Sequence, residues 1–220
     1  MKPSVLELRS KQLLSRGPRT RRQLGSWQLA VERQAMALRD ELGLADMDAL
    51  AQDQALATVR NCQVWPLKNL RELGFEHLLH FRGAGRHIGA FAVKDESGDI
   101  DIVFNDEHPP ADVRVHLMEE IFHIRLGHPF DTLRIYADRR VSRTYSEAKE
   151  DEAFGCGVAA LLPYGGLYAM LARGDHIARI AEHFTVPIPV VQFRVGATKL
   201  GDFAVAPARQ LPLFANLGLT

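Results

Sequence analysis

Arg114-Val-His-Leu-Met-Glu-Glu-Ile-Phe-His-Ile-Arg-Leu-Gly-His128 is the stretch that decides the fold. Apolar residues recur through it and just before it at the spacing of one helix face, namely Val113, Leu117, Ile121, Ile124 and Leu126. Gly127 and Pro129 follow, and these residue types commonly end a helix. The pattern predicts a helix that is buried on most sides.

Four polar side chains share one side of this helix. At about 100° per residue, His116, Glu119, Glu120 and His123 fall within a sector of about 100°. Large apolar residues flank the sector, namely Leu117, Met118, Ile121 and Phe122. Acids and histidines on a buried helix need partners, and a metal ion satisfies several of them at once.

Residues one helical turn apart can ligate the same ion. Glu119 and His123 have this spacing, and His116 with Glu120 is a second such pair that stays open. If Glu119 and His123 are the pair, the helix carries the zinc-peptidase motif H-E-x-x-H with glutamate in place of the first histidine. Glu119 and His123 would then be ligands, and Glu120 would be the general base that activates the attacking water. A polar helix with ordinary one-turn pairs has the same spacing, so this stretch alone leaves both interpretations open.

A second helix is predicted over Glu147-Ala-Lys-Glu-Asp-Glu-Ala-Phe-Gly-Cys-Gly-Val-Ala-Ala-Leu-Leu-Pro163. Acidic residues gather in its first turns, where the helix dipole favours negative charge, and Pro163 ends it. Small residues follow the acids and permit close helix packing, namely Ala153, Gly155, Gly157, Ala159 and Ala160. Such a helix is suited to pack against the first one and to supply a third, carboxylate ligand.

Together the two helices resemble the ImmA/IrrE-type metallopeptidases over roughly residues 40–200. That family combines an H-E-x-x-H helix ending in x-x-L-x-H with a later E-x-x-A-N-x-F-A-x-x-L-L-x-P segment. The matching positions here are Ile124 to His128, Glu150, Ala153, Leu161 and Pro163, with Asn105 and Arg114 upstream. The resemblance implies that Glu150 is the third metal ligand, and Glu152 is the reserve candidate.

The chain departs from the family pattern at three positions. Glu119 replaces a histidine, Phe154 an asparagine and Cys156 a phenylalanine. Two carboxylates and one histidine form a harder donor set than two histidines and one carboxylate. Mn²⁺ is therefore expected as a cofactor beside Zn²⁺.

The resemblance implies a metal-dependent endopeptidase that cleaves a helix-turn-helix transcriptional repressor in a stress, DNA-damage or phage-related response. The replacement at Glu119 supports an alternative, an inactive member that regulates transcription by binding DNA or protein. A di-iron carboxylate protein is a third interpretation, because Glu120 to His123 reads E-x-x-H, but the chain holds no second copy.

Composition and cysteine content predict where in the cell the protein is located. The formal net charge is zero, and two cysteines, Cys62 and Cys156, make no disulfide framework, so a cytoplasmic location is expected. No apolar run is long enough to span a membrane, and the start does not resemble a signal peptide, so no membrane partner is expected.

The chain is predicted to divide into three parts. Residues 1–40 form a basic helical arm with nine Lys or Arg against three acids. One interpretation is that this arm binds nucleic acid, with Trp27 as the stacking residue. The other is that it lies on the core as an amphipathic helix, and the apolar spacing favours this second interpretation. Residues 41–203 form the metallopeptidase-like domain, whose end at 177–200 resembles a helix-turn-helix. Its last helix is mostly apolar, which favours packing over DNA reading. Residues 204–220 form a tail.

The fold class expected is α+β: a mainly helical, zincin-like domain with a small antiparallel sheet and a helical C-terminal part. Residues 86–94 and 100–105 are predicted to pair as a hairpin, with Val103 facing outward, and 58–66 as a further strand. In peptidases of this build an edge strand beside the metal helix binds the substrate.

Three further residues carry minor hypotheses. Cys62 is a candidate inhibitory fourth ligand, because thiolates bind zinc strongly. Tyr145 is a candidate for stabilising the oxyanion. His128, at the end of the metal helix, is expected to interact with the helix dipole and not to be a ligand.

Overall fold

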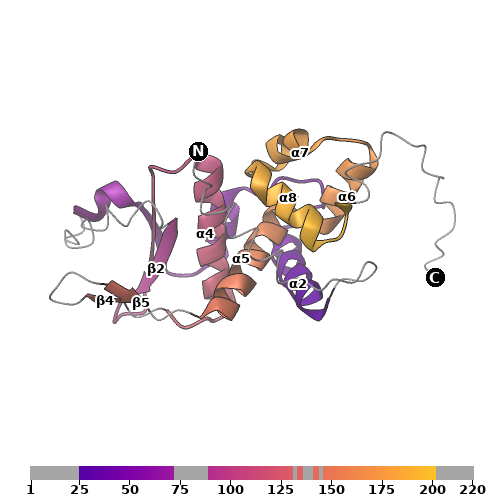
Figure 1. Ribbon diagram of the computed structural model, residues 1–220. Coiled ribbons are helices and arrows are strands. Elements are labelled where there is room, and N and C mark those ends of the chain that lie inside the picture. The colour runs from indigo at the N-terminus through magenta and orange to yellow at the C-terminus, as the bar shows by residue number, and fades with distance from the viewer. Residues whose placement is uncertain (1–24, 72–88, 131–132, 136–140, 144–145, 202–220) are drawn as a thin grey trace.

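The computed structural model describes residues 25–71, 89–130, 133–135, 141–143 and 146–201 (Figure 1). Its helices are α2 (Ser26–Glu41), α3 (Gln52–Ala57), α4 (Pro110–Arg125), α5 (Glu147–Leu161), α6 (Tyr164–Ala172), α7 (Ile177–Phe184) and α8 (Ile188–Ala197), with a 3-10 turn η1 (Leu67–Arg71). Its strands are β1 (Cys62–Pro66), β2 (Ala90–Lys94), β3 (Ile100–Phe104), β4 (Leu133–Ile135) and β5 (Val141–Arg143). The prediction of a mainly helical α+β fold is confirmed.

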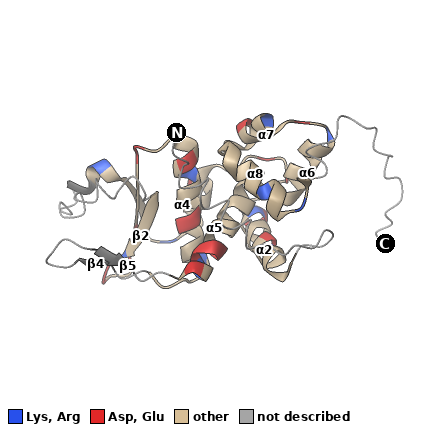
Figure 2. Ribbon diagram, in the orientation of Figure 1, with Lys and Arg blue, Asp and Glu red and all other residues tan. Residues whose placement is uncertain are grey.

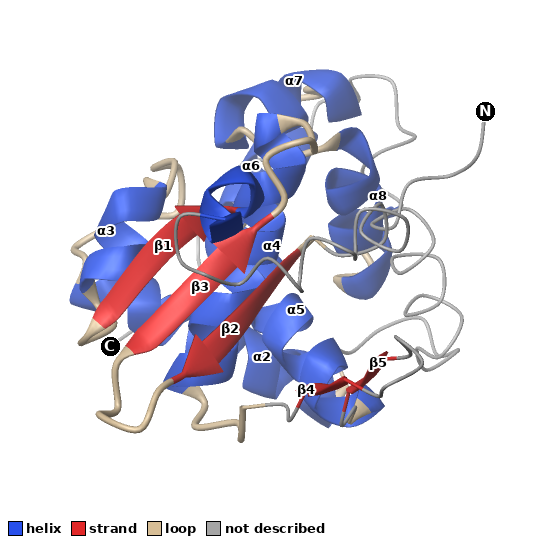
Figure 3. Cartoon of the chain, turned by 90° about the vertical axis from the view of Figure 1, so that its left-hand side faces the viewer, coloured by secondary structure: helices blue, strands red, loops and turns tan. Residues whose placement is uncertain are grey.

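Helix α4 lies at the centre of the fold. A three-stranded sheet covers one side of it, and α5 packs along another (Figures 1 and 3). Leu117 and Ile121 of the predicted apolar face are almost fully removed from solvent, as is Met118, while Val113 and Ile124 are half-buried. The helix that carries the polar sector is therefore held rigidly on several sides.

The sheet has the strand order β1-β3-β2. The predicted hairpin is present, with β2 antiparallel to β3, but β1 runs parallel to β3, so the sheet is mixed and not purely antiparallel. No tight turn joins β1 to the hairpin, and the sequence pattern alone does not set the direction of such a strand.

The exposure of one side chain in β3 differs from the expectation. Val103 faces away from the main core cluster, as predicted by the alternation, but it is only 3% exposed. Its neighbour on β1 is Trp65, whose indole N–H donates to Asp101 Oδ1 at 2.8 Å. The second face of the sheet is therefore partly covered as well.

A glycine lets α5 approach α4 at the level of Glu119. A Cβ atom added at Gly157 would lie 3.1 Å from the carbonyl carbon of Met118 and 3.2 Å from the backbone nitrogen of Glu119. Such contacts with helix backbone are tighter than ordinary packing allows. Gly157, one of the small residues predicted for α5, therefore lets the two helices come together beside the polar sector, whereas Gly155 faces Trp27 and Val31 of α2.

We predict that Gly157→Val destabilises the protein by about 1–3 kcal/mol, because the added side chain must push α5 away from α4. Denaturant unfolding measures this change. Gly196→Val is the matched control, since Gly196 is exposed on α8 and the same substitution there removes only a flexible helix residue. Equal stability of the two variants would contradict the close approach.

Helix α2 packs on the core, as the apolar spacing favoured. Its buried Arg39 donates to the backbone carbonyls of Ala160 at 2.8 Å and Asp48 at 2.8 Å. Burial lowers the pKa of Arg39, against the raising effect of Asp46 and Asp48. Arg39 is thus a structural residue of the core; residues 1–24 of the predicted basic arm lie outside the described residues.

Helices α7 and α8 also pack against the rest of the protein. The buried Arg194 of α8 donates to the carbonyl of Leu162 at 3.0 Å and pairs with Glu32 of α2 at 2.6 Å. Arg194 was one of the few polar side chains that this helix could offer to DNA, and its contacts favour the packing role. The predicted tail at 204–220 lies outside the described residues.

Over the described residues, no single helix is long and apolar enough to cross a membrane. Helices α5 and α6 reach the necessary length and composition only as a pair, and they are bent by 52° with respect to each other.

Candidate metal centre

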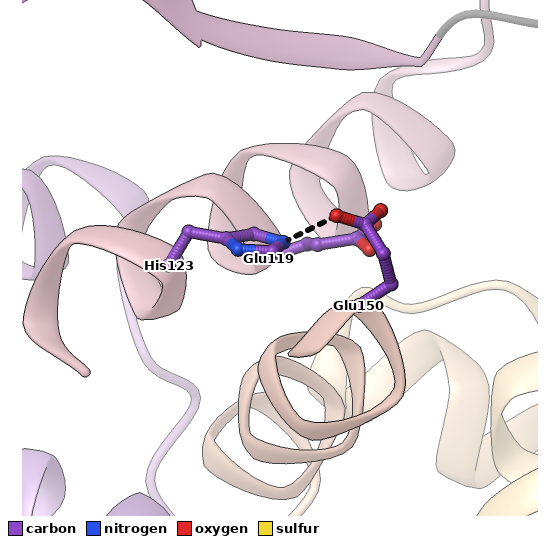
Figure 4. A group of neighbouring side chains, drawn as sticks. All are labelled: Glu119, His123 and Glu150. Atoms are coloured by element: carbon purple, nitrogen blue, oxygen red, sulfur yellow. Dashed lines mark ion pairs between the residues drawn. The ribbon is translucent and has the colours of Figure 1, made fainter. Parts of the chain in front are cut away.

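The structure brings Glu119, His123 and Glu150 together where α5 begins beside α4 (Figure 4). One ligand atom from each lies within 4.8 Å of the others, and His123 Nε2 is 3.3 Å from Glu150 Oε1. Both carboxylates are buried, with Glu119 5% and Glu150 7% exposed. In the part of the chain that is described, this is the one group of three such residues that could hold an ion.

Local sequence places each of these side chains. Glu119 and His123 are one turn apart on α4, so they project from the same side of the helix. Glu150 lies in the first turn of α5, where the positive end of the helix dipole stabilises a carboxylate. Figure 2 shows acidic residues gathered on α4 and at the start of α5. The close packing at Gly157 then sets the distance between the two helices.

The donor set fits a divalent cation. Two ligands about 2.0–2.2 Å from a tetrahedral ion lie about 3.4 Å apart, which agrees with the 3.3 Å between His123 Nε2 and Glu150 Oε1. A divalent charge would also neutralise two neighbouring buried carboxylates, which are costly to bury alone. Three protein ligands leave a position for water or substrate, as in catalytic zinc sites.

Two other polar residues of α4 lie beside this group and outside it. Glu120 is 5% exposed, so the side chain assigned as general base is buried. His116 Nδ1 is 3.9 Å from Glu119 Oε2, and its ring packs against Gly89 and His108. Among the described residues, no third ligand joins the alternative pair of His116 and Glu120.

Cys62 and Tyr145 were the remaining candidates for the site. Cys62 lies at the start of β1 and is not part of the group, and its thiol contacts the carbonyl of Gln63. Burial, and then Asp101, raise the pKa of Cys62, which favours the thiol over the thiolate that binds metal. Tyr145 lies outside the described residues. Cys156 is fully buried in the core, and burial, with Glu152 and Glu32, raises its pKa to about 12.

His128 is not part of the three-residue group, as expected, and its ring has two further contacts. Its ring does not act on the helix dipole alone: His128 Nδ1 is 3.0 Å from His123 Nδ1, and His128 Nε2 is 3.3 Å from Glu152 Oε2. Glu152, the reserve ligand, is therefore bonded to His128 and is not in the three-residue group. The signal available in the sequence was Gly127, which permits a turn that folds the next residue back on the helix.

Comparison with curated proteins and with solved structures finds no match. A family model, the IrrE N-terminal-like domain of a peptidase family, matches residues 85–195. This match covers half of the chain and includes α4, α5 and all three grouped residues. The chain therefore belongs to the ImmA/IrrE family of metallopeptidase-like proteins.

Proposed function

We propose that this protein is a metal-dependent endopeptidase in which Glu119, His123 and Glu150 hold one Zn²⁺ or Mn²⁺ ion. The observation that carries the proposal is the convergence of two buried carboxylates and the half-buried His123 from two helices, with ligand atoms within 4.8 Å of one another. Family membership supplies the expected reaction class. The carboxylate-rich set is the reason for keeping manganese beside zinc.

When bound, the cation supplies a Lewis acid that polarises the scissile carbonyl and makes a water molecule more acidic. Glu120 accepts the proton of the attacking water and passes it to the leaving amine. Because Glu120 directly follows Glu119 on α4, the helix backbone fixes the position of the base relative to this ligand. Its burial keeps bulk water from competing for the carboxylate.

Strand β2 offers an edge for an extended substrate. It is the last strand of the sheet, it packs near α4, and no other described strand pairs with its free side. The Asn105 N–H donates to the Gly89 carbonyl, so residues 89, 91 and 93 face β3 in the antiparallel ladder. The backbone N–H of Ala92 therefore points to the free edge, where a substrate strand would add.

We predict that Ala92→Pro weakens substrate binding without breaking the β2–β3 ladder, because proline removes only an outward N–H. The loss of one hydrogen bond should raise KM about five- to tenfold. Ala92→Val is the matched control, since valine keeps the N–H and favours strands. Steady-state kinetics on a cleaved protein measure the effect, and an unchanged KM in Ala92→Pro would argue against strand addition at this edge.

The proposed substrate is a helix-turn-helix transcriptional repressor cut in a stress, DNA-damage or phage-related response. Support for this comes from the family resemblance, which implies a narrow substrate. The test is to map new protein N-termini in cells with and without the wild-type protein. A cut within such a repressor would support the proposal, and cuts confined to unrelated proteins would contradict the proposed substrate.

The replacement of histidine by Glu119 favours one alternative, an inactive member that regulates transcription by binding protein or, through the basic N-terminal arm, nucleic acid. The burial of Arg194 against Glu32 gives no support to DNA reading by α8. The two functions differ in one observable: an inactive regulator keeps its biological effect when Glu120 is replaced, and a peptidase loses it.

A further inference from the structure

A chain of hydrogen-bonded side chains extends away from the metal centre. The two ring nitrogens of His123 face different partners, with Nε2 3.3 Å from Glu150 Oε1 and Nδ1 3.0 Å from His128 Nδ1. The His123 and His128 rings meet edge to face, with centroids 5.0 Å apart. His128 Nε2 then lies 3.3 Å from Glu152 Oε2. The order is Glu152, His128, His123 and the metal position.

The backbone explains how His128 reaches His123. Gly127 adopts a left-handed conformation, with φ of 66°, directly after the last residues of α4. The Gly127 N–H donates to the Ile124 carbonyl at 3.0 Å, and the His128 N–H donates to the His123 carbonyl at 2.9 Å. These two bonds define a Schellman motif, which folds the residue after the glycine back against the last turn of the helix. The position of His128 is thus built into the helix end.

On neutral rings, one placement of protons satisfies both contacts of His128, with Glu152 and with His123. The Glu152 carboxylate only accepts hydrogen bonds, so His128 must present N–H from Nε2. A His128 ring that carries one proton then accepts at Nδ1, so His123 must donate from its own Nδ1. The lone pair of His123 is then left on Nε2, the nitrogen that faces Glu119 and Glu150.

We propose that His128 and Glu152 are positioning residues that hold His123 in the tautomer and orientation required to bind the ion through Nε2. The inference rests on the proposed metal centre and assigns a role to two residues that are not ligands. Groups that accept the second N–H of a metal-binding histidine fix its ring in this way. Here the acceptor is a second histidine, which a carboxylate orients in turn.

The tautomer of His123 can be measured without metal. Histidine ¹⁵N chemical shifts of the metal-free protein distinguish a ring protonated at Nδ1 from one protonated at Nε2. We expect the Nδ1–H form in the wild type and its loss in His128→Leu. His128→Asn is the conservative rescue, because the Asn side-chain oxygen can occupy the place of Nδ1 and accept the same hydrogen bond. A spectrum of His123 that is the same in His128→Leu as in the wild type would overturn the inference.

Metal affinity gives an independent readout by competition of Zn²⁺ between the protein and a chromophoric chelator. His128→Leu should raise the Kd about 10–100-fold, and His128→Asn should restore most of the affinity. Glu152→Ala should act in the same direction but more weakly, since the Glu152 side chain is 43% exposed. Glu182→Ala on α7, an exposed glutamate of a helix outside the site, is the control. Thermal unfolding checks that each variant is folded.

The outcomes separate this inference from the proposed function. Tight Zn²⁺ binding in the wild type with unchanged affinity in folded His128→Leu and Glu152→Ala would overturn the positioning role and leave the peptidase proposal intact. A wild-type protein that binds neither Zn²⁺ nor Mn²⁺ would overturn the proposed function, while the ¹⁵N spectrum would still decide whether His128 sets the tautomer of His123.

Discussion

Glu120→Gln protein is expected to cleave its substrate about 10²–10⁴-fold more slowly than the wild type while keeping its metal. Glutamine has nearly the same shape as glutamate but cannot accept the proton of the attacking water. Glu120 is 5% exposed, so bulk solvent is poorly placed to replace it. Ligands from Glu119, His123 and Glu150 remain in place, so the bound ion should be retained.

New protein N-termini, mapped in cells that produce either form, measure this effect even while the substrate is unidentified. Termini that appear with the wild type should be missing with Glu120→Gln and present with the surface control Glu182→Gln on α7. Termini that persist unchanged with Glu120→Gln would show that this residue is not the base. An undiminished biological effect without any new termini would instead favour the inactive regulator.

Glu150→Ala is expected to lose the ion. Removing one of three ligands leaves two, and the loss of affinity should exceed the roughly 10–100-fold typical of residues that only support a ligand. The Glu150 carboxylate is buried and lies 3.3 Å from His123 Nε2, so the substitution removes an anionic ligand directly at the metal position. Competition with a chelator gives the Kd, and circular dichroism checks the fold.

Glu152→Ala is the matched comparison, because both residues lie in the first turns of α5 and both were candidate ligands. In the structure only Glu150 belongs to the three-residue group, and Glu152 contacts His128. Glu150→Ala should therefore reduce affinity much more than Glu152→Ala. The opposite order would move the third ligand to Glu152 and contradict a site built from Glu119, His123 and Glu150.

Much of the central helix pair could be predicted from the sequence. Apolar spacing located α4, and the acidic start and small-residue face located α5 with its first residue correct at Glu147. One-turn spacing offered two ligand pairs, Glu119 with His123 and His116 with Glu120, and the resemblance to the family favoured the first. The choice between Glu150 and Glu152 could not come from spacing, because the rotation of α5 about its axis depends on its packing against α4.

Other features depend on contacts between distant segments, which local patterns do not encode. The parallel direction of β1 and the burial of Val103 follow from how the sheet assembles. The pair between Arg194 and Glu32 joins the two ends of the described fold. The contacts of the His128 ring could not be predicted even though the helix end was, because the left-handed turn at Gly127 determines where the ring points.

The metal content of the purified, folded protein tests the central claim most directly. Elemental analysis of wild-type protein, after exposure to Zn²⁺ and Mn²⁺ and removal of excess ions, should find close to one ion per chain bound by Glu119, His123 and Glu150. Folded protein that retains no ion under these conditions would contradict the metal centre and, with it, the proposed peptidase function.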